Sequence, residues 1–448
     1  MLSVDQARHS AESLVQRALD AGADAADVIY VGSHSTSVQV RLGDLEDVSG
    51  SEGEEIGLRL FIGQKSASVS SSDLSDEALT ELARRAHAMA VEAPEDPFAG
   101  LAPQERLQRG AFPELDSVDP AEPQPADLRS RALSAEQAAR AVAGVTNSNG
   151  AGASASGSTI ALATSHGFAG AYATTGHSVS AGVLAGEGGG MQRDHAWHSA
   201  RHLADLEDAE GIGRRAGERA VARVNPTRPK PGRMPVIFDT RVASSLIGHL
   251  SGAISGSSIA RKSSFLQDKL GQRLFAPGVS IVDDPLRPRG LRSRPFDGEG
   301  LSVARMVLVE DGVLQSRMAD SASALQHGID PTGHAARGVG GSPGVAPSNF
   351  YLAAGSRSRE ALLAAYPEAI LVTELIGQGV NGITGDYSRG AAGFLVRNGE
   401  IAEPVSEITI ASNLLDMFAT LEPASDLEFR RGMDSPTVLI PEMTVGAA

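Results

Sequence analysis

Three histidines lie close together in the middle of the chain, at His195, His198 and His202. On a helix, spacings of three and four residues would bring their imidazoles to one face, where they could hold a zinc ion. The glycines at 188–190 and the residues after them favour a loop that enters a strand. On a strand, His195 and His198 point to opposite faces. A zinc site and a solvated polar strand are therefore the two alternatives for this segment.

Two glycine-rich motifs match known patterns but lack the context that those patterns require. Residues 377–382 have the spacing of a dinucleotide-binding loop, which needs a following helix to face the pyrophosphate. Residues 383–390 are too rich in glycine to form that helix. Residues 340–344 match a serine-nucleophile turn, yet Pro343 follows the serine and has no N–H to donate to an oxyanion. We interpret the second motif as a turn, and the first does not support a nucleotide site.

The composition excludes several classes of protein. The chain has 448 residues, with 55 acidic and 39 Lys or Arg residues, a net charge of −16 and no cysteine. The acidic excess repels phosphates and anionic lipid, so we expect neither nucleic acid nor a membrane as a partner. No apolar run approaches the roughly 18 residues of a membrane span, and the first residues do not resemble a signal peptide. Without cysteine there are no disulfides and no thiolate ligands. We expect a soluble, cytoplasmic, multidomain protein.

Two proline-rich stretches divide the chain, because seven prolines between residues 94 and 125 and four between 226 and 235 disfavour regular elements there. We predict an N-terminal α+β domain (1–93), a Pro-rich linker (94–125), a middle α+β region (126–225) and a β-rich C-terminal domain (233–448). The predicted fold class is therefore α+β, with two regions of helix and sheet followed by a β-rich domain.

Apolar periodicity and capping residues predict the individual elements. Ser3 and Gln6 form a capping-box pattern at the start of a helix that Gly22 is well placed to end. Ser75 begins a second helix that reaches about Glu92. Alternating apolar residues predict strands at 38–42 and 56–62. The middle region is predicted to hold helices over 126–143 and 206–223 and strands at 158–164, 168–174 and 177–185. The third region has one clear helix, 359–365, and a second candidate within 242–259.

Three segments of the third region identify a family. They are Leu246–Gly256 running into Arg261–Leu266, then Thr373–Phe394, and finally Asn398–Ile410. Together they closely resemble the PmbA/TldE family, the partner half of the TldD/TldE peptidase. The resemblance covers essentially the whole chain, and it implies a TldD/PmbA-like fold with a metallopeptidase-like C-terminal domain.

The TldD branch of this family resembles a zinc metallopeptidase. Its HExxxH helix supplies two His ligands and a Glu that activates water, and a distal Cys completes the ligands. Counting back from Arg261-Lys262, the two His positions fall on Gly248 and Ala253, and the Glu position falls on His249. Gly and Ala cannot bind zinc, and the chain has no cysteine. The resemblance therefore implies no catalytic residue and no metal in this chain, with zinc held by a TldD-type partner.

The resemblance implies a subunit that is inactive alone and works in a TldD/TldE heterodimer. That peptidase degrades or processes unfolded or short peptides, as in microcin-type maturation and antitoxin turnover. This chain would add half of a closed chamber and an exposed sheet edge that holds a peptide by strand addition. Two alternatives remain. One is a homodimeric binding or regulatory protein of the gyrase-modulator type, and the other is an independent hydrolase that uses the three histidines.

Several polar residues are candidates to face the substrate or the partner subunit. They are Arg261, Lys262, Asn381, Thr384, Asp386, Tyr387 and Arg389. A purely structural role is the alternative for each group. Asp386 and Arg389 could pair locally, and Arg261 and Lys262 could lie at a helix C-terminus, where cations are favoured. We expect His249 to be a hydrogen-bonded packing residue rather than a remaining metal ligand.

Overall fold

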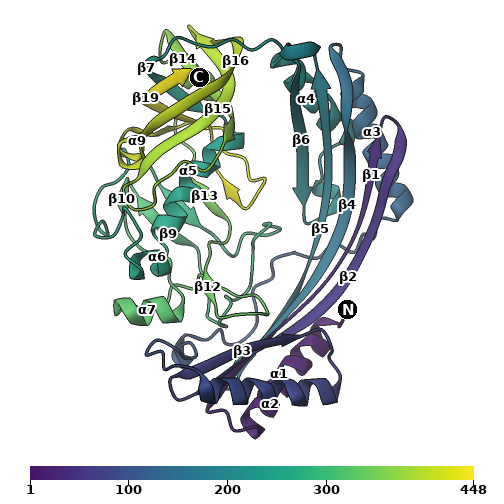
Figure 1. Ribbon diagram of the computed structural model, residues 1–448, viewed down its shortest axis with the longest axis vertical. Coiled ribbons are helices and arrows are strands. Elements are labelled where there is room, and N and C mark those ends of the chain that lie inside the picture. Colours follow the sequence, from purple (N-terminus) through teal and green to yellow (C-terminus); the bar gives the residue numbers. More distant parts are fainter. Residues whose placement is uncertain (448) are drawn as a thin grey trace.

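A long, curved, antiparallel sheet carries the N-terminal half of the protein, and the C-terminal half packs beside it (Figure 1). The computed structural model describes residues 1–447. The six strands of the sheet follow the order β3-β2-β1-β4-β5-β6. They are β1 (Ala25–Arg41), β2 (Asp44–Ile62), β3 (Lys65–Ser71), β4 (Val145–Thr164), β5 (Ala169–Ala185) and β6 (Gln192–Ala200). No helix among residues 1–447 is long and apolar enough to cross a membrane.

The strands of this sheet are longer than the sequence predicts. The expected strands 168–174 and 177–185 form one strand, β5, and β4 begins at Val145 rather than at residue 158. Leu42, expected within a strand, instead starts the β1–β2 turn with a positive φ of 55°. The additional strand residues are mostly Gly, Ala and Ser, so they show no apolar alternation. They are extended because β4 pairs with β1 on one side and β5 on the other. The first and middle regions consequently share one sheet.

Four helices cover one face of the sheet. They are α1 (Val4–Asp20), α2 (Asp76–Glu92), α3 (Pro125–Arg140) and α4 (Ala209–Ala222). The predicted capping box of α1 is confirmed: Gln6 N donates to Ser3 Oγ at 3.3 Å, and Ser3 N donates to Gln6 Oε1 at 3.0 Å. Helix α4 packs closely on α3 through Gly213, where a Cβ would lie only 1.9 Å from the carbonyl oxygen of Ala135. The tight contact between these helices therefore requires glycine.

The C-terminal domain, residues 232–447, combines two larger sheets and a two-stranded one with short helices, which confirms the α+β class. One sheet has the order β16-β15-β14-β7-β19-β17, and it closes on itself because β16 also pairs with β19. The other has the order β10-β9-β8-β13-β18. The strands are β7 (Gly232–Phe238), β8 (Ile281–Asp283), β9 (Met306–Glu310), β10 (Val313–Leu314), β11 (Ala335–Ala336), β12 (Gly344–Val345), β13 (Phe350–Leu352), β14 (Glu368–Ile376), β15 (Asp386–Arg397), β16 (Glu400–Asn413), β17 (Glu422–Pro423), β18 (Met433–Asp434) and β19 (Val438–Ala447).

The helix that we expect within residues 242–259 is two helices in the structure. They are α5 (Thr240–Ala253) and α6 (Gly256–Ala260), and they are separated at Ile254 and Ser255. The other helices of the domain are α7 (Ser321–His327), α8 (Arg359–Leu363) and α9 (Leu414–Thr420). Helix α5 contacts β7 and β14 of one sheet and β13 and β18 of the other. It therefore lies between the two sheets, in the main core of the domain.

A buried ion-pair cluster fastens the lower part of the C-terminal domain to the curved sheet. The carboxylate of Asp27 on β1 lies between the guanidiniums of Arg59 on β2 and Arg337 of the C-terminal domain, and all three side chains are almost fully buried. Apolar packing continues the contact, since Ile29 on the same strand belongs to a cluster with Phe296 of the C-terminal domain.

A second network joins the two halves at the upper part of the molecule. The buried carboxylate of Asp194 on β6 is 2.9 Å from Arg241 Nη1 on α5 and 3.4 Å from Arg223 Nη1 at the end of α4. Arg223 also pairs with Glu374 on β14. These contacts connect the last strand of the sheet to the C-terminal domain, so the two networks together set the spacing between the halves.

The buried carboxylate of Glu299 predicts a pH-dependent stability. Burial, together with the neighbouring Asp297, raises the pKa of Glu299 to about 7. Because this folded-state pKa lies above the unfolded value, the contribution of Glu299 to stability falls as the pH rises through that interval. Glu299→Gln removes the charge and keeps an oxygen that can accept from Ser321 N and Oγ. We expect its free energy of unfolding to rise by roughly 1–3 kcal/mol at about pH 8, and the gain to shrink at about pH 5.

Urea unfolding at both pH values measures this difference. The exposed Glu12→Gln on α1 is the matched control, and it should leave the free energy of unfolding unchanged at either pH. A Glu299→Gln protein that is no more stable than the wild type at about pH 8 would contradict the prediction.

Asp194→Asn tests the upper network. The substitution keeps the shape of the side chain but leaves the largely buried side chains of Arg223 and Arg241 without their shared carboxylate. We expect the free energy of unfolding to fall by roughly 2–4 kcal/mol, measured by urea denaturation near neutral pH. Asp47→Asn, on an exposed part of β2, is the control and should change the free energy by less than about 0.5 kcal/mol. Equal losses in both variants would show that the network does not hold the halves together.

Candidate functional site

Helix α5 carries Gly248, His249 and Ala253, the three positions at which the family resemblance predicts the counterpart of the zinc-binding motif. The helix begins after Asp239, whose side chain accepts from Arg241 N at 3.1 Å. Its apolar residues, Ala243, Leu246, Ile247 and Leu250, are buried between the two sheets. This arrangement leaves Gly248 and His249 half-buried on another side of the helix, while Ala253 is buried at its end.

His249 faces two polar residues of β15, Tyr387 and Arg389. The imidazole of His249 lies edge-on to the Tyr387 ring, with 6.0 Å between ring centroids. Burial lowers the pKa of His249, and the charge of Arg389 lowers it further. Burial also raises the pKa of Tyr387 to about 12, against the opposing effect of Arg389. At pH 7 the three side chains are therefore a neutral imidazole, a neutral phenol and a guanidinium.

Hydrogen bonding around His249 differs from our expectation. Among the described residues, neither His249 Nε2 nor Tyr387 Oη has a hydrogen-bond partner, although both atoms are buried. The expected hydrogen bond of a packing histidine is thus missing at Nε2. Unpaired buried polar atoms cost free energy, and the contact that the structure gives the imidazole is its edge-on packing against the Tyr387 ring.

Zinc does not fit the residues at this place. His249 offers one ligand atom, Gly248 and Ala253 offer none, and the nearby cation of Arg389 would repel a metal ion. In the part of the chain that the structure describes, no group of three His, Cys, Asp or Glu side chains is arranged to hold a metal.

The glycine-rich loop before β15 is held by its own polar residues. Asn381 Oδ1 accepts from Ile383 N at 2.9 Å, Thr384 Oγ1 donates to Asp386 Oδ2 at 2.7 Å, and Asn413 Nδ2 donates to Asp386 Oδ1 at 3.1 Å. The residues after the loop form strand β15, which agrees with our rejection of a nucleotide-binding helix. The alternative of a local Asp386–Arg389 pair is wrong, because Asp386 binds these neighbours instead and strand residues three apart face opposite sides.

Arg261 and Lys262 lie next to this loop. Arg261 is the C-cap of α6, and Lys262 follows it with a positive φ of 53°. The segment then turns so that Phe265 N donates to Gly382 O at 2.8 Å. Both basic side chains are exposed. The structure therefore brings Arg261 and Lys262 close to the candidate residues of the 381–389 segment. The position of the two basic residues at the C-terminus of α6 also agrees with a purely structural role for them.

The three clustered histidines lie on and after strand β6, and each contacts different groups. His195 is 70% exposed and sits 3.9 Å from Asp194. His198 Nδ1 accepts from Glu207 N at 3.1 Å. His202 is buried beyond the strand, with Nε2 2.9 Å from the carbonyl oxygen of Asp116. The predicted strand is confirmed, and the three imidazoles do not converge on a common point.

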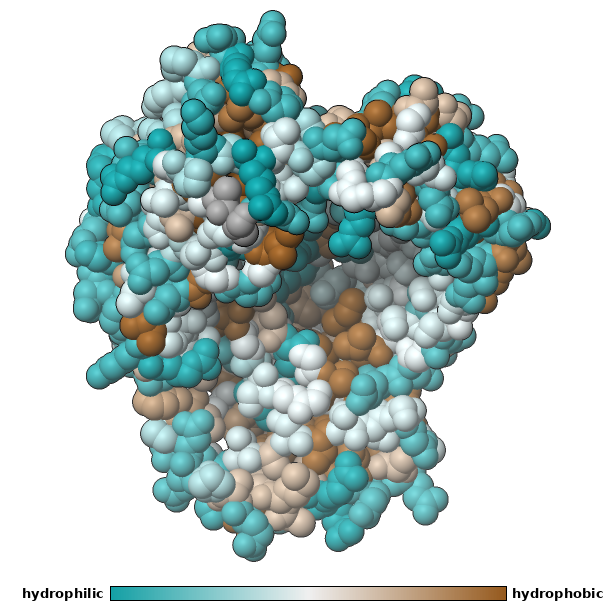
Figure 2. Space-filling model, turned by 45° about the horizontal axis from the view of Figure 1, so that its top comes forward, coloured by the Kyte–Doolittle hydropathy of each residue, from teal (hydrophilic) through white to brown (hydrophobic). Residues whose placement is uncertain are grey.

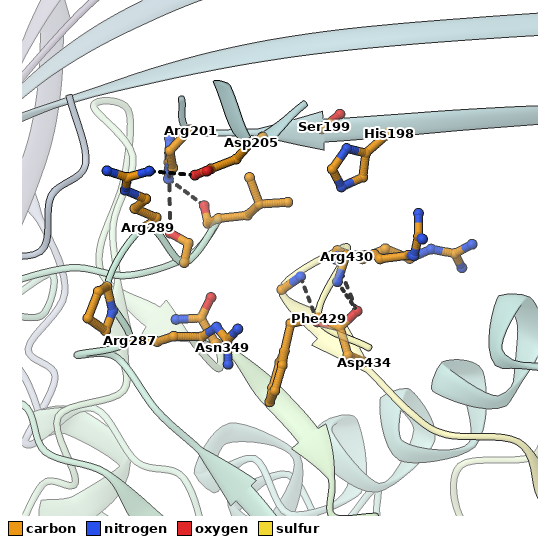
Figure 3. A pocket seen from close by; sticks show the side chains of 16 residues that line it. His198, Ser199, Arg201, Asp205, Arg287, Arg289, Asn349, Phe429, Arg430 and Asp434 are labelled. Atoms are coloured by element: carbon orange, nitrogen blue, oxygen red, sulfur yellow. Dashed lines mark hydrogen bonds and ion pairs between the residues drawn. The ribbon is translucent and has the colours of Figure 1, made fainter. Parts of the chain in front are cut away.

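A groove between β6 and the C-terminal domain is the feature that sequence reasoning missed. Two adjoining cavities of about 330 and 430 Å³ share Arg430, Arg431 and Asp434 in their walls. We call them together the arginine groove. Figure 2 shows the molecule hollowed between its two lobes, and Figure 3 shows His198 and Ser199 across one cavity from Phe429 and Arg430. The walls come from segments near residues 195–219, 240–242, 287–291, 349, 373–375 and 428–435. Among the residues that sequence reasoning had singled out, only the histidines of β6 and the start of the segment Thr373–Phe394 lie in them.

Comparisons with known proteins identify the family. Profiles of the PmbA/TldA metallopeptidase family match domain 1 over residues 26–90, the central domain over 118–224 and the C-terminal domain over 231–447. The chain is 38% identical to Metalloprotease PmbA of Escherichia coli O157:H7 over 447 residues, which cover 99% of this chain and 97% of that protein. It is 35% identical to the Metalloprotease PmbA homolog of Haemophilus influenzae, over 98% of this chain and 95% of the homolog.

Solved structures share the fold along the whole chain. A Bacteroides thetaiotaomicron protein described as a candidate modulator of DNA gyrase superposes with a TM-score of 0.91 at 25% identity, covering 100% of both chains. TldE from Thermococcus kodakarensis has a TM-score of 0.88 at 21% identity, covering 98% of this chain and 100% of its own, which shows a common fold. The profiles and the two full-length relatives establish that this chain belongs to the PmbA/TldE family of metalloprotease-like proteins.

Proposed function

We propose that this chain is the metal-free subunit of a two-chain cytoplasmic peptidase, in which a TldD-type partner holds zinc and carries out hydrolysis. The observation that carries the proposal is which residues helix α5 has at three positions. Gly248, His249 and Ala253 stand where two His ligands and a Glu would be needed, and His249 packs on Tyr387 beside Arg389. A side chain set of this kind binds no zinc, so the metal belongs to the partner.

The substrates of the assembled peptidase are unfolded or short peptides, as in microcin-type maturation and antitoxin turnover. The hollow between the two lobes (Figure 2) offers a place for an extended chain. Strand β6 is the last strand of its sheet, and within residues 1–447 it pairs with β5 alone. Its other edge can hold a peptide through main-chain hydrogen bonds, which are only weakly selective for sequence.

The opposite edge of the sheet favours a different partner chain over a second copy. Strand β3 pairs with residues 56–62 of β2, so the outer edge of residues 44–55 has no strand partner among residues 1–447. Six carboxylates lie along it: Asp44, Glu46, Asp47, Glu52, Glu54 and Glu55. Two copies joined through this edge would bring like charges together, which disfavours self-association there. A partner with basic residues would not meet this repulsion.

Assembly and metal content test the proposal directly. We expect the chain expressed alone to carry close to no zinc and to cleave no peptide, because α5 offers a single ligand. Co-expressed with the TldD-type chain of the same organism, it should elute as a mixed complex with about one zinc per pair and peptidase activity. Size-exclusion with light scattering, elemental analysis and a fluorogenic peptide assay measure the three properties.

Two outcomes would overturn the proposal. About one zinc per isolated chain, retained through mild chelation, would mean that this chain binds its own metal. Peptidase activity that is lost on triple substitution of His195, His198 and His202 would then assign it as an independent hydrolase. A homodimer that binds no TldD-type chain would instead favour a regulatory protein of the gyrase-modulator type.

His249→Ala tests whether the remaining histidine takes part in catalysis. We expect the activity of the assembled complex to stay within about threefold of wild type, a change of less than about 0.7 kcal/mol in the barrier, since the imidazole is a packing group. His9→Ala, an exposed change on α1, is the control. Complete loss of activity in a complex that still assembles and still holds zinc would assign His249 a direct role.

A further inference from the structure

The arginine groove contains more positive charge than its own carboxylates neutralise. Eight arginines line its two cavities, against four acidic residues. The arginines are 201, 215, 219, 241, 287, 289, 430 and 431, and the acidic residues are Asp205, Glu374, Glu428 and Asp434. This excess stands out in a chain with a net charge of −16.

Half of these arginines already have carboxylate partners. Arg215 pairs with Glu207, and Arg241 with Asp194. Arg289 pairs with Asp116 and Asp205, and Arg430 with Glu207 and Glu428. The acidic residues of the groove likewise have partners within the protein. Glu374 pairs with Arg223, and Asp434 accepts the backbone N–H groups of residues 430, 431 and 432.

The other four arginines have no carboxylate within ion-pair distance among the described residues. Arg201 donates to the carbonyl oxygens of residues 175, 290 and 291. Arg431 Nη1 donates to Arg241 O at 2.6 Å, and Arg219 Nη1 to His195 O at 3.3 Å. The guanidinium of Arg287 lies 3.4 Å above the centroid of the Phe429 ring.

Burial makes these charges costly. It lowers the pKa of Arg219 to about 10, with the charge of Arg241 adding to the effect, and it also lowers the pKa values of Arg431 and Arg201. A guanidinium held in a partly buried wall without a counter-ion gains strongly from a bound anion. The planar fork of each guanidinium suits the paired oxygens of a carboxylate or a phosphate.

The free edge of β6 runs along the same groove. His195 N donates to Asp194 Oδ1 at 2.7 Å and His195 O accepts from Arg219, so the main chain of residue 195 points away from β5. In an antiparallel pair this direction alternates, which turns the N–H and C=O of Trp197 and Ser199 the same way. Both residues line the groove. Main-chain donors and acceptors therefore lie beside unpaired cations.

We propose that the arginine groove binds an extended, acidic peptide segment, which pairs with the edge of β6 and places its carboxylates on Arg219, Arg287 and Arg431. The apolar parts of such a segment pack on the Trp197 and Phe429 rings, which already stack with Arg431 and Arg287. The peptide nature of the ligand rests on the proposed function. The carboxylate specificity goes beyond it, because strand addition alone would not select acidic sequences.

The single tryptophan of the chain makes the test direct. Trp197 lies in the groove, 5.2 Å from the guanidinium of Arg431, so its fluorescence reports binding there. The full-length chain is titrated with a short N-acetylated peptide of alternating valine and glutamate, and in parallel with the same peptide carrying glutamine. We expect saturable binding of the glutamate peptide, with at least about tenfold weaker binding of the glutamine peptide and weakening by salt. Isothermal titration calorimetry confirms the affinities.

Two variants and one control locate the site. Arg431→Gln and Arg287→Gln should each weaken binding of the glutamate peptide about tenfold, while Arg431→Lys should recover part of the loss. Arg84→Gln, on an exposed part of α2 where Arg84 pairs with the neighbouring Glu81, should bind as the wild type does. Circular dichroism melts check that each variant is folded. Arg287 pairs with no carboxylate in the described part of the chain, so Arg287→Gln remains informative if Arg431→Gln is unstable.

Three results would overturn the inference. The first is equal binding of the glutamate and glutamine peptides, and the second is wild-type affinity in both arginine variants. The third is binding of inorganic polyphosphate, lost in Arg431→Gln, without binding of the peptide, because the groove would then serve phosphate. The titration needs no partner subunit. If the chain binds the peptide but never joins a TldD-type chain, the proposed function is refuted and the groove is still a binding site for acidic peptides.

Discussion

The buried carboxylate of Asp27 is the contact on which the arrangement of the two halves depends. Burial opposes its ionisation, but Arg337 and Arg59 outweigh burial and hold the pKa of Asp27 below its usual value. Its stabilising contribution is therefore present above the unfolded pKa and is lost as the pH falls through the folded one. Losing either arginine would leave an under-compensated charge inside the protein. The C-terminal domain is thus held against β1 and β2 in one position.

The second network, around Asp194, fixes the upper part of the same interface, and the groove lies beside it. Ion pairs around Asp194 rather than a continuous apolar layer join the halves there, which leaves space for a cleft whose walls come from both. A cleft of this origin can be lined by charged side chains because each paired arginine has a carboxylate from a neighbouring element. The four arginines without one give the cleft its positive character.

Sequence motifs predicted the candidate site only in part. Counting from Arg261 located Gly248, His249 and Ala253 on a helix, and α5 carries all three. The sequence also pointed to the 381–389 loop, which the structure joins to the Arg261 segment through the Phe265–Gly382 hydrogen bond. It could not show that His249 packs on Tyr387, because those residues lie 138 positions apart in the chain. The groove was invisible for the same reason, since no short motif contains it.

The sequence by itself determined the family, the α+β class, the capped helices α1 and α2 and the non-ligating residues Gly248 and Ala253 of α5. Each of these depends on residue type or on short spacing: a capping serine, a 3.6-residue period, or a glycine where an imidazole is needed. Only the tertiary structure decided the length of β4 and β5, the sharing of one sheet between the first two regions and the arginine groove. Those features arise from strand pairing and charge compensation between segments that are distant in the chain. The sequence could not predict them, because glycine, serine and alanine carry no strong strand signal and the role of an arginine depends on which carboxylate lies beside it.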